Sequence, residues 1–397
     1  MSGPMPKDDV ATRSYGRDGS AVTVVGAGPA GLACAIVLAR AGRRVLIHEA
    51  HDRVGGRFHG DFQGLENWSS AEDVLDGLAT RGVGPRFDHH PVHAGIVFDS
   101  WGNRYEVASD RPIYYLVRRG SDIGTLDRGL LAQALELGVE IRFNDRVQRA
   151  DGTAVLAGGP RVADAIAVGY VFDTDMADGN WIAFDDTLAP LGYSYLLIHD
   201  GRGTVASCMF SGFKQEAQYV ARTVEMFRER VGLSMRDAMP LGGFANFRLP
   251  RRAVQGGHLV VGEQGGFQDA LAGFGMRYAM HSGVLAARSL IEGAGYPELW
   301  RRELLPQMRA SVVNRMLFEL AGARGRRWVV SRRLARGDVR EFLRRIYRVS
   351  LLSTLLFPFA HRRYRERLKD PSCDHVKCSC VWCRCGGEQA ALQTQQS

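Results

Sequence analysis

One glycine-rich turn constrains the fold of this chain more than any other feature of its sequence. The segment Val25-Gly26-Ala27-Gly28-Pro29-Ala30-Gly31 follows a β-branched run at 21–25 and leads into an Ala- and Leu-rich stretch at 29–41. A second apolar run, at 44–48, ends directly before Glu49. A strand, a tight turn, a helix and another strand in this order predict a βαβ unit.

Each glycine of this turn has a mechanical role in binding a dinucleotide. Gly26 permits the tight turn, Gly28 lets the backbone approach a pyrophosphate, and Gly31 lets the helix pack closely on the strand. The amino-terminal end of the helix faces the phosphates with the positive end of its dipole. Glu49 would accept hydrogen bonds from the ribose hydroxyls of the adenosine. The residues predicted to bind the dinucleotide are Gly26, Gly28, Pro29, Ala30, Gly31 and Glu49.

A second glycine-rich segment distinguishes a flavin from a nicotinamide cofactor. Arg53-Val54-Gly55-Gly56-Arg57 begins four residues after Glu49. It resembles the GG motif of the FAD-containing, glutathione-reductase-like superfamily. The resemblance implies that this backbone also approaches FAD and that an arginine binds a phosphate bidentately; the alternative is an ordinary Arg/Gly loop. The FAD-binding residues implied here are Ala50, Arg53, Gly56 and Arg57.

Two further segments, Val261–Phe267 and Ala272–Met276, contain glycines next to apolar residues. They are similar to the late flavin motif of the geranylgeranyl reductase family, which reads GD-x-A-G … P-x-x-G-x-G-I. In this chain Glu263 stands at the position of the motif's Asp, and Leu271-Ala272-Gly273 lacks its proline. The resemblance implies a helix amino terminus beneath the isoalloxazine, which stabilises negative charge on reduced flavin. The residues that it adds to the FAD site are Gly262, Glu263, Gly273, Gly275 and Met276.

Arg119 is a further FAD-binding candidate, since an arginine placed similarly in the family touches the flavin or its phosphates. The alternative is that Arg118 and Arg119 are a solvated pair.

A substrate pocket is implied by Pro190-Leu191-Gly192-Tyr193-Ser194-Tyr195, which resembles the family's P-x-G-Y-x-W motif with Tyr195 in place of Trp. We therefore expect Tyr193, Tyr195 and Phe267 to line an apolar pocket over the flavin. The alternative is that these rings are ordinary core aromatics.

The resemblance implies a doubly wound α/β FAD-binding domain of the Rossmann-like, three-layer kind, with an inserted antiparallel substrate sheet. We expect the FAD-binding domain at 21–59, 110–175 and 250–295, and the substrate domain at 60–109 and 176–249. The other expected segments are a polar leader at 1–20, a basic helical region at 296–370 and a Cys-rich tail at 371–397.

The resemblance implies the activity of an FAD-dependent reductase, which transfers hydride from flavin N5 to a C=C bond of an apolar substrate such as an isoprenoid. A second GxGxxG turn is missing from the sequence, so the electron donor is expected to be external, either NAD(P)H or a ferredoxin-like protein. One alternative is a flavin monooxygenase, although Ala165–Tyr170 lacks the Asp-Gly pair of the aromatic hydroxylases. The other is an electron-transfer flavoprotein. The sequence identifies no catalytic proton donor.

The carboxy-terminal region differs in composition from the rest of the chain. Residues 301–369 hold 19 Arg/Lys against five acids, whereas the whole chain has a net charge of only +8. Few aromatic residues accompany these arginines and no nucleic-acid motif does, so nucleic acid is not expected as a partner. The apolar run 349–360 is too short to span a bilayer. It is either a buried helix or, with its basic flanks, a contact with an anionic membrane.

Five of the seven cysteines crowd into 13 residues. This distribution is unlike a secreted disulfide framework, so the expected compartment is the cytoplasm. The basic flanks of residues 349–360 add a peripheral contact with the membrane as an open alternative. Thiolates so closely spaced favour a metal site, with zinc ahead of an iron–sulfur cluster, and a reduced tail is the alternative. The candidate ligands are Cys373, Cys378, Cys380, Cys383 and Cys385.

Overall fold

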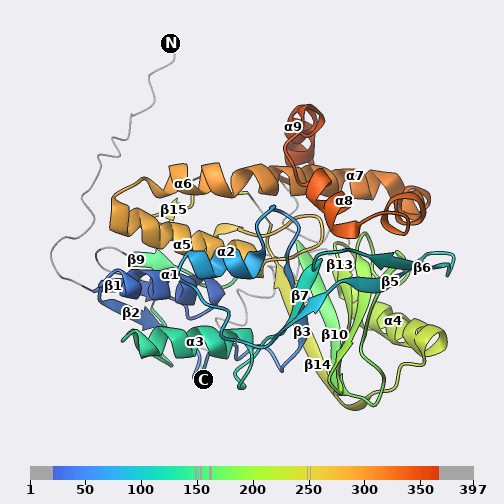
Figure 1. Ribbon diagram of the computed structural model, residues 1–397, viewed down its shortest axis with the longest axis horizontal. Coiled ribbons are helices and arrows are strands. Elements are labelled where there is room, and N and C mark those ends of the chain that lie inside the picture. Colours follow the sequence, from blue (N-terminus) through green and yellow to red (C-terminus); the bar gives the residue numbers. More distant parts are fainter. Residues whose placement is uncertain are drawn as a thin grey trace.

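The computed structural model describes residues 21–147, 150, 152, 154–160, 163–247, 249–250 and 252–365. Within these residues the strands form three sheets, and nine α-helices accompany them (Figure 1). The predicted α/β architecture is confirmed: a dinucleotide-binding half, a large and mostly antiparallel sheet, and a carboxy-terminal layer of helices.

The first sheet contains the predicted βαβ unit. Five of its six strands are parallel to one another, and the sixth, β15, pairs antiparallel at one edge. The crossover helix α1 (Pro29–Arg40) connects β1 to β2. In spatial order the strands are β15 (Val254–Gln255), β16 (His258–Val260), β9 (Ala154–Leu156), β1 (Val22–Val25), β2 (Val45–His48) and β8 (Glu140–Arg142).

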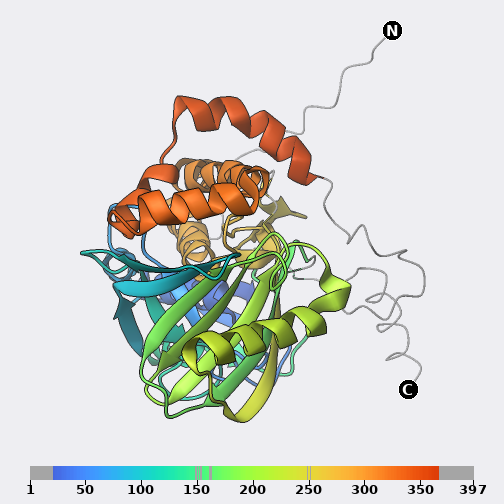
Figure 2. The ribbon, with the colours of Figure 1, turned by 90° about the vertical axis from the view of Figure 1, so that its right-hand side faces the viewer.

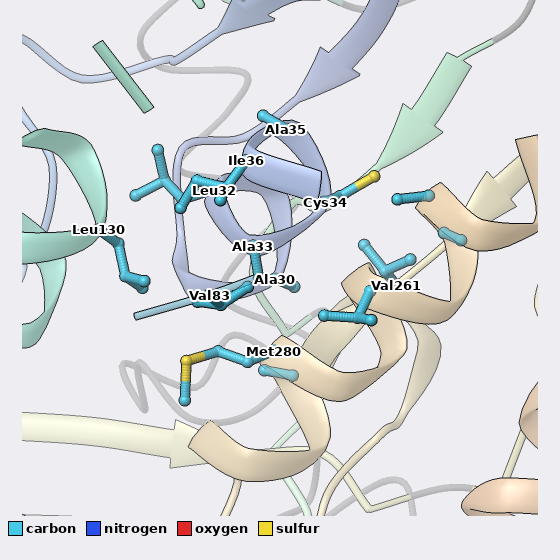
Figure 3. Close-up of a cluster of buried hydrophobic side chains, with 14 of the residues drawn as sticks. Ala30, Leu32, Ala33, Cys34, Ala35, Ile36, Val83, Leu130, Val261 and Met280 are labelled. Atoms are coloured by element: carbon cyan, nitrogen blue, oxygen red, sulfur yellow. The ribbon is translucent and has the colours of Figure 1, made fainter. Parts of the chain in front are cut away.

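Three helices cover this sheet, with α1 between α3 (Leu126–Glu136) and α5 (Met276–Glu292). Small side chains let α1 and α5 approach closely: a Cβ on Gly283 would lie 2.1 Å from the Ala30 carbonyl oxygen. Figure 3 shows Leu130 of α3 and Met280 of α5 beside α1. The tight packing fixes the position of the turn that precedes α1.

A small antiparallel sheet and one short helix follow the βαβ unit in the chain. The helix, α2 (Val74–Thr80), is capped by the Asp73 side chain, which accepts a hydrogen bond from the amide of Leu75 at 3.0 Å. The strands of this sheet are β3 (Phe62–Glu66), β7 (Tyr114–Arg118) and β4 (His89–Val92).

The large sheet has seven strands, all antiparallel to their neighbours except for the β5–β11 pair. Helix α4 (Glu216–Val231), preceded by a 3₁₀ turn at Phe213–Gln215, covers one face (Figure 2). In spatial order the strands are β14 (Arg236–Ala245), β10 (Ala165–Asp173), β13 (Arg202–Met209), β12 (Tyr193–His199), β11 (Gly179–Phe184), β5 (Ala94–Asp99) and β6 (Arg104–Ala108).

Alternation along β12 directs side chains to opposite faces of the large sheet. Leu196 and Ile198 pack toward α4, and the Ser194 hydroxyl lies 2.7 Å from that of Thr223 on the helix. Tyr193 and Tyr195 consequently point to the other face, which the dinucleotide-binding half and the carboxy-terminal helices cover.

The structure corrects the expected extent of the FAD-binding domain at two strands. Residues 165–175 were expected in the FAD-binding domain, but β10 pairs on both edges with strands of the large sheet. Strand β9 is instead the third strand of the dinucleotide-binding sheet, on the far side of β1 from β2. It is followed by Ala157-Gly158-Gly159, which also lacks an Asp-Gly pair. Strand β7, likewise expected in that domain, pairs with β3 and β4.

Helices form the described carboxy-terminal region, as expected. None of the described helices is long and apolar enough to cross a membrane. After α5 come α6 (Tyr296–Glu303), α7 (Leu305–Val329), a π-helical turn at Val330–Leu334, α8 (Val339–Ile346) and α9 (Leu351–Arg365).

Candidate functional site

The glycine-rich turn between β1 and α1 is held by backbone contacts that leave no room for side chains at two positions. Gly26 has a φ of +108°, and a Cβ there would lie 2.5 Å from the Ala157 carbonyl oxygen. A Cβ on Gly31 would lie 2.0 Å from the carbonyl oxygen of Gly26. At Gly28 a Cβ would meet no described atom within 4 Å. Gly26 and Gly31 therefore serve the packing of the crossover, whereas Gly28 borders open space.

That open space is a cavity of about 790 Å³ at the carboxyl ends of the parallel strands. The amino terminus of α1 forms one wall, and the 3₁₀ turn η2 (Gly262–Gly265) forms another. Unpaired amides and the positive dipole end of a helix favour an anion at this position. The predicted residues that line the cavity are Gly26, Gly28, Pro29, Ala30, Glu49, Ala50, Arg53, Gly56, Arg57, Arg119, Gly262, Glu263, Gly275 and Met276.

Glu49 is fixed in this cavity by the surrounding backbone. One carboxylate oxygen, Oε2, accepts a hydrogen bond from the Ala27 amide at 2.7 Å, and Oε1 accepts one from the His51 amide at 2.9 Å. Oε1 also lies 2.8 Å from His51 Nδ1. Each oxygen has further acceptor capacity, so the carboxylate fits the hydroxyl groups of a ribose.

Two arginines lie where this cavity meets a second one. Arg57 forms an ion pair of 3.1 Å with Glu263, which joins the two motifs across 206 residues of sequence. Arg119 is buried and binds Asp127 bidentately, with distances of 2.8 and 2.9 Å. Both guanidinium groups lie over the Phe58 ring, 4.8 and 4.2 Å from its centroid.

Arg119 keeps its charge in this buried place. Burial lowers the pKa of Arg119, but the neighbouring carboxylates, above all Asp127, raise it by more than burial lowers it. The net shift of the pKa is therefore upward. Arg119 is therefore not one of a solvated pair, because it is buried and paired with Asp127; it also lines both cavities, where contact with FAD stays a prediction.

The second cavity, of about 180 Å³, lies between the dinucleotide-binding half and the large sheet. Arg57, Phe58, Arg119, Glu263, Gly275 and Met276 line both cavities. Its remaining walls are largely aromatic and aliphatic: Phe62, Tyr114, Ile166, Ile182, Tyr193, Tyr195, Leu197, Phe244 and Phe274.

The loop that ends at α5 forms the floor of the second cavity and is fastened at many points. Gln268 donates to the Gly273 carbonyl at 2.8 Å, and the Ala272 amide donates to Asp269 at 2.7 Å. Tyr347 donates its hydroxyl to Asp269 at 2.6 Å. These bonds hold the glycines before α5 in place, which a preorganised binding site requires.

Burial also sets the protonation of the groups around the second cavity. It raises the pKa of the Cys208 thiol to about 11 and raises the phenol pKa of Tyr193 and of Tyr195. All three groups are therefore neutral at neutral pH. Burial also raises the pKa of Asp269, beneath the cavity, to about 6.

The structure brings most of the predicted residues together, with three differences. Tyr193 and Tyr195 line the second cavity as expected, but Gly273, predicted for the FAD site, lines that cavity and not the dinucleotide cavity. Gly31 is buried beneath the turn and does not line either cavity. Phe267 does not line the pocket, because its fully buried ring packs edge-on against Trp300, with centroids 5.6 Å apart.

Several cavity residues were not predicted from the sequence. Phe274 is one that a local signal marks, since it stands between two glycines, Gly273 and Gly275. A Cβ on Gly64 would lie 2.5 Å from the Phe274 ring, so the ring crosses β3 at a glycine. Phe58 and Cys208 carry no comparable signal, because their roles arise from contacts between distant segments.

Comparison with known proteins agrees with the fold and the turn. A model of the NAD(P)-binding Rossmann-like domain matches residues 24–63. The L-amino-acid oxidase of Bungarus fasciatus is 57% identical over 47 residues, which are 12% of this chain and 9% of that protein. The chain therefore matches only a small part of this curated relative.

Solved structures match over most of the chain. A geranylgeranyl bacteriochlorophyll reductase-like protein from Thermoplasma acidophilum has a TM-score of 0.64 at 15% identity, covering 87% of this chain and 98% of that one. The flavin-dependent brominase Bmp2 has a TM-score of 0.59 at 18% identity, covering 87% and 98%.

The fold and the cavity together define the class: this chain has the fold of the FAD-dependent oxidoreductases, with the dinucleotide-binding domain at its amino-terminal side. Within that class its structure is similar to the geranylgeranyl reductase-like protein, and the resemblance seen in the sequence is confirmed at the level of the fold.

The predicted metal ligands, Cys373 to Cys385, lie outside the described residues. Among the residues that the structure does describe, His, Cys, Asp and Glu form no group that could hold a metal ion.

Proposed function

We propose that this chain is an FAD-dependent reductase that saturates a carbon–carbon double bond of an apolar substrate. The observation that carries the proposal is the apolar cavity, which shares Arg57, Phe58, Arg119 and Glu263 with the dinucleotide cavity. A substrate in the smaller cavity would therefore lie directly beside the redox end of a dinucleotide in the larger one.

The residues of the larger cavity fit FAD. Gly28 leaves its backbone open to a pyrophosphate, the α1 amino terminus attracts the phosphates, and Glu49 suits the ribose. When bound there and reduced by an external electron donor, FAD would supply a hydride to one carbon of the double bond, while the other carbon takes a proton from a polar group or water. Arg119 and the amino terminus of α5 contribute positive potential beside the redox centre.

The wall of the smaller cavity orients the substrate and excludes water. The Tyr193 hydroxyl donates a hydrogen bond to the Ala272 carbonyl at 2.6 Å, so its proton is engaged by the loop before α5. We find no hydrogen bond from the Tyr195 hydroxyl to any described residue. Because burial keeps Tyr195 protonated, its hydroxyl is the cavity group best placed to bind a polar atom of the substrate. The neutral thiol of Cys208 does not favour nucleophilic catalysis.

An isoprenoid is the substrate class that we propose, because the lining is apolar and the sequence motifs resemble the geranylgeranyl reductases. The electrons would come from NAD(P)H or a ferredoxin-like protein. A peripheral contact with a membrane would suit such a substrate. The alternative activity is a monooxygenase, since a brominase shares the fold, and an electron-transfer flavoprotein is the second alternative.

The test is an anaerobic reaction of the FAD-loaded, chemically reduced protein with polyunsaturated isoprenoid lipids. We expect products heavier by two hydrogens per turnover and reoxidation of the flavin at the same rate. The matched control is Gly28→Ala, which we expect to hold less FAD than the parent under the same loading and to form correspondingly less product. Flavin reoxidation that requires oxygen, with an oxygen atom in the product, would replace the reductase with the monooxygenase.

The cysteine cluster remains a proposed metal site, with zinc favoured over an iron–sulfur cluster because its spacing differs from the ferredoxin pattern. Metal analysis of the purified full chain tests it. About one zinc per chain is expected, and a metal-free protein that binds no added zinc would contradict it. Iron with acid-labile sulfide would favour the electron-transfer alternative.

A further inference from the structure

Helix α9 exposes an apolar face at the outer edge of the molecule. Figures 1 and 2 both show α9 at the periphery of the carboxy-terminal helices, away from the large sheet. Leu351 and Leu355 are 86% and 71% exposed, and Leu352 and Phe359 are 61% and 71% exposed. We call these four residues the α9 face. Large apolar side chains gathered in this way mark an interaction site.

The opposite face of α9 is firmly docked on the protein. Ala360 and Tyr364 are buried in a cluster that also contains Val312 and Val313 of α7. The helix is also held by Arg363, which pairs with Glu319 of α7 at 3.2 Å. The docking fixes the orientation of α9, so its apolar face points outward as a consequence of packing.

Positive charge flanks the α9 face at both ends. Residues 338–365 contain seven arginines and only two acids. Arg345, Arg348 and Arg362 are exposed, and none of them forms an ion pair with a described residue. Both acids are already engaged: Asp338 accepts hydrogen bonds at the start of α8, and Glu341 pairs with Arg344.

We propose that the α9 face binds the surface of an anionic lipid membrane. The apolar side chains would enter the boundary between headgroups and acyl chains, and the arginines would lie against the lipid phosphates. The helix has 15 residues, about 22 Å in length. It is thus too short to span the bilayer, and its docked face keeps it parallel to the surface.

The charge pattern favours a membrane over a second copy of this chain. In a symmetric dimer through the α9 face, the same patch would occur on both sides of the interface. The arginines of the two copies would then face one another and repel, whereas anionic headgroups attract them. The proposal concerns binding alone and therefore stands apart from the proposed reductase activity.

The test is flotation of the full chain with vesicles of phosphatidylcholine alone or mixed with phosphatidylglycerol. We expect the protein to float with the mixed vesicles at low salt, and much less at high salt or without phosphatidylglycerol. Leu355→Glu/Phe359→Glu should weaken the partitioning at least about tenfold. The matched control is Ile123→Glu, since Ile123 is 87% exposed on a distant loop, and it should float like the parent.

The electrostatic part has its own pair of variants. Arg345→Ser/Arg348→Ser should lower partitioning about fivefold for each arginine removed. Arg44→Ser/Arg128→Ser removes two exposed arginines elsewhere and should have little effect. The proposal is overturned if the parent does not float at low salt, or if the α9 variants float as it does. A dimer that dissociates when α9 is changed, without flotation of the parent, would also overturn it.

Discussion

Replacing Gly28 by alanine separates binding of the cofactor from stability of the chain. Gly28 has φ −77° and ψ 176°, which any residue can adopt, and a Cβ there would meet no described atom within 4 Å. The unliganded protein should therefore change its free energy of unfolding by less than about 1 kcal/mol. The new methyl group would instead occupy the space beside the backbone that a pyrophosphate needs.

The expected loss of affinity follows from the hydrogen bonds at stake. A backbone amide bonded to a charged phosphate contributes about 1.5–3 kcal/mol. Preventing one such contact lowers FAD affinity about 10- to 100-fold. Gly31→Ala is the contrasting variant, since its Cβ would lie 2.0 Å from the Gly26 carbonyl oxygen. Overpacking of this kind destabilises the folded chain by about 1–3 kcal/mol.

Urea unfolding of the unliganded variants measures the stability, and titration of FAD by its fluorescence measures the affinity. We expect Gly28→Ala to lower the affinity for FAD without lowering the free energy of unfolding, and Gly31→Ala to lower the free energy of unfolding. If Gly28→Ala bound FAD as tightly as the parent, the cavity beside Gly28 would not be the pyrophosphate site.

Three further predictions concern buried or cavity carboxylates. Burial raises the pKa of Asp269 to about 6 from its ordinary value of 3.8, so the protonated carboxyl group favours the folded state. Its contribution to the free energy of unfolding is about 3 kcal/mol. This contribution is full below pH 4 and is lost as the pH rises through 6. Urea unfolding across this range should show Asp269→Asn without that slope, and an unchanged slope would refute the assignment. Asp127→Ala should destabilise the chain by about 3–5 kcal/mol, measured in the same way, because it leaves Arg119 buried without its partner; a change below 1 kcal/mol would contradict this. Glu49→Gln should weaken FAD binding about tenfold in a titration, and undiminished affinity would exclude a ribose contact.

The sequence allowed prediction of the dinucleotide-binding half because its determinants are local. The turn at 25–31 and the acidic residue Glu49 lie within some 25 residues of one another in the sequence. The structure places both beside the dinucleotide cavity, as predicted. The helix amino terminus implied by the segment Ala272–Met276 likewise forms, since α5 (Met276–Glu292) begins there. Local patterns of this kind state where an element begins and ends, since capping and periodicity belong to neighbouring residues.

The errors arose where pairing between distant segments decides the structure. Residues 165–170 are a short run of small and apolar residues that suits either sheet, and only the partners β13 and β14 assign it to the large one. Phe267 is apolar in either role, and the position of Trp300 places it in the core. Periodicity cannot reveal such partners, because they are supplied by tertiary contacts.

The C-terminal apolar run shows a third outcome. Two alternatives were open for residues 349–360, a buried helix or a surface contact. The structure combines a docked face at Ala360 with an exposed face at Leu355. The sequence alone could not separate the two faces, since both are apolar.

The most direct measurement is the amount of flavin held by the purified full chain after incubation with FAD and removal of the unbound excess. We expect one noncovalently bound flavin per polypeptide, visible in its yellow absorption, and clearly less flavin retained by Gly28→Ala. A colourless protein that retains its folded structure, or one that holds equal flavin after that substitution, would contradict the account.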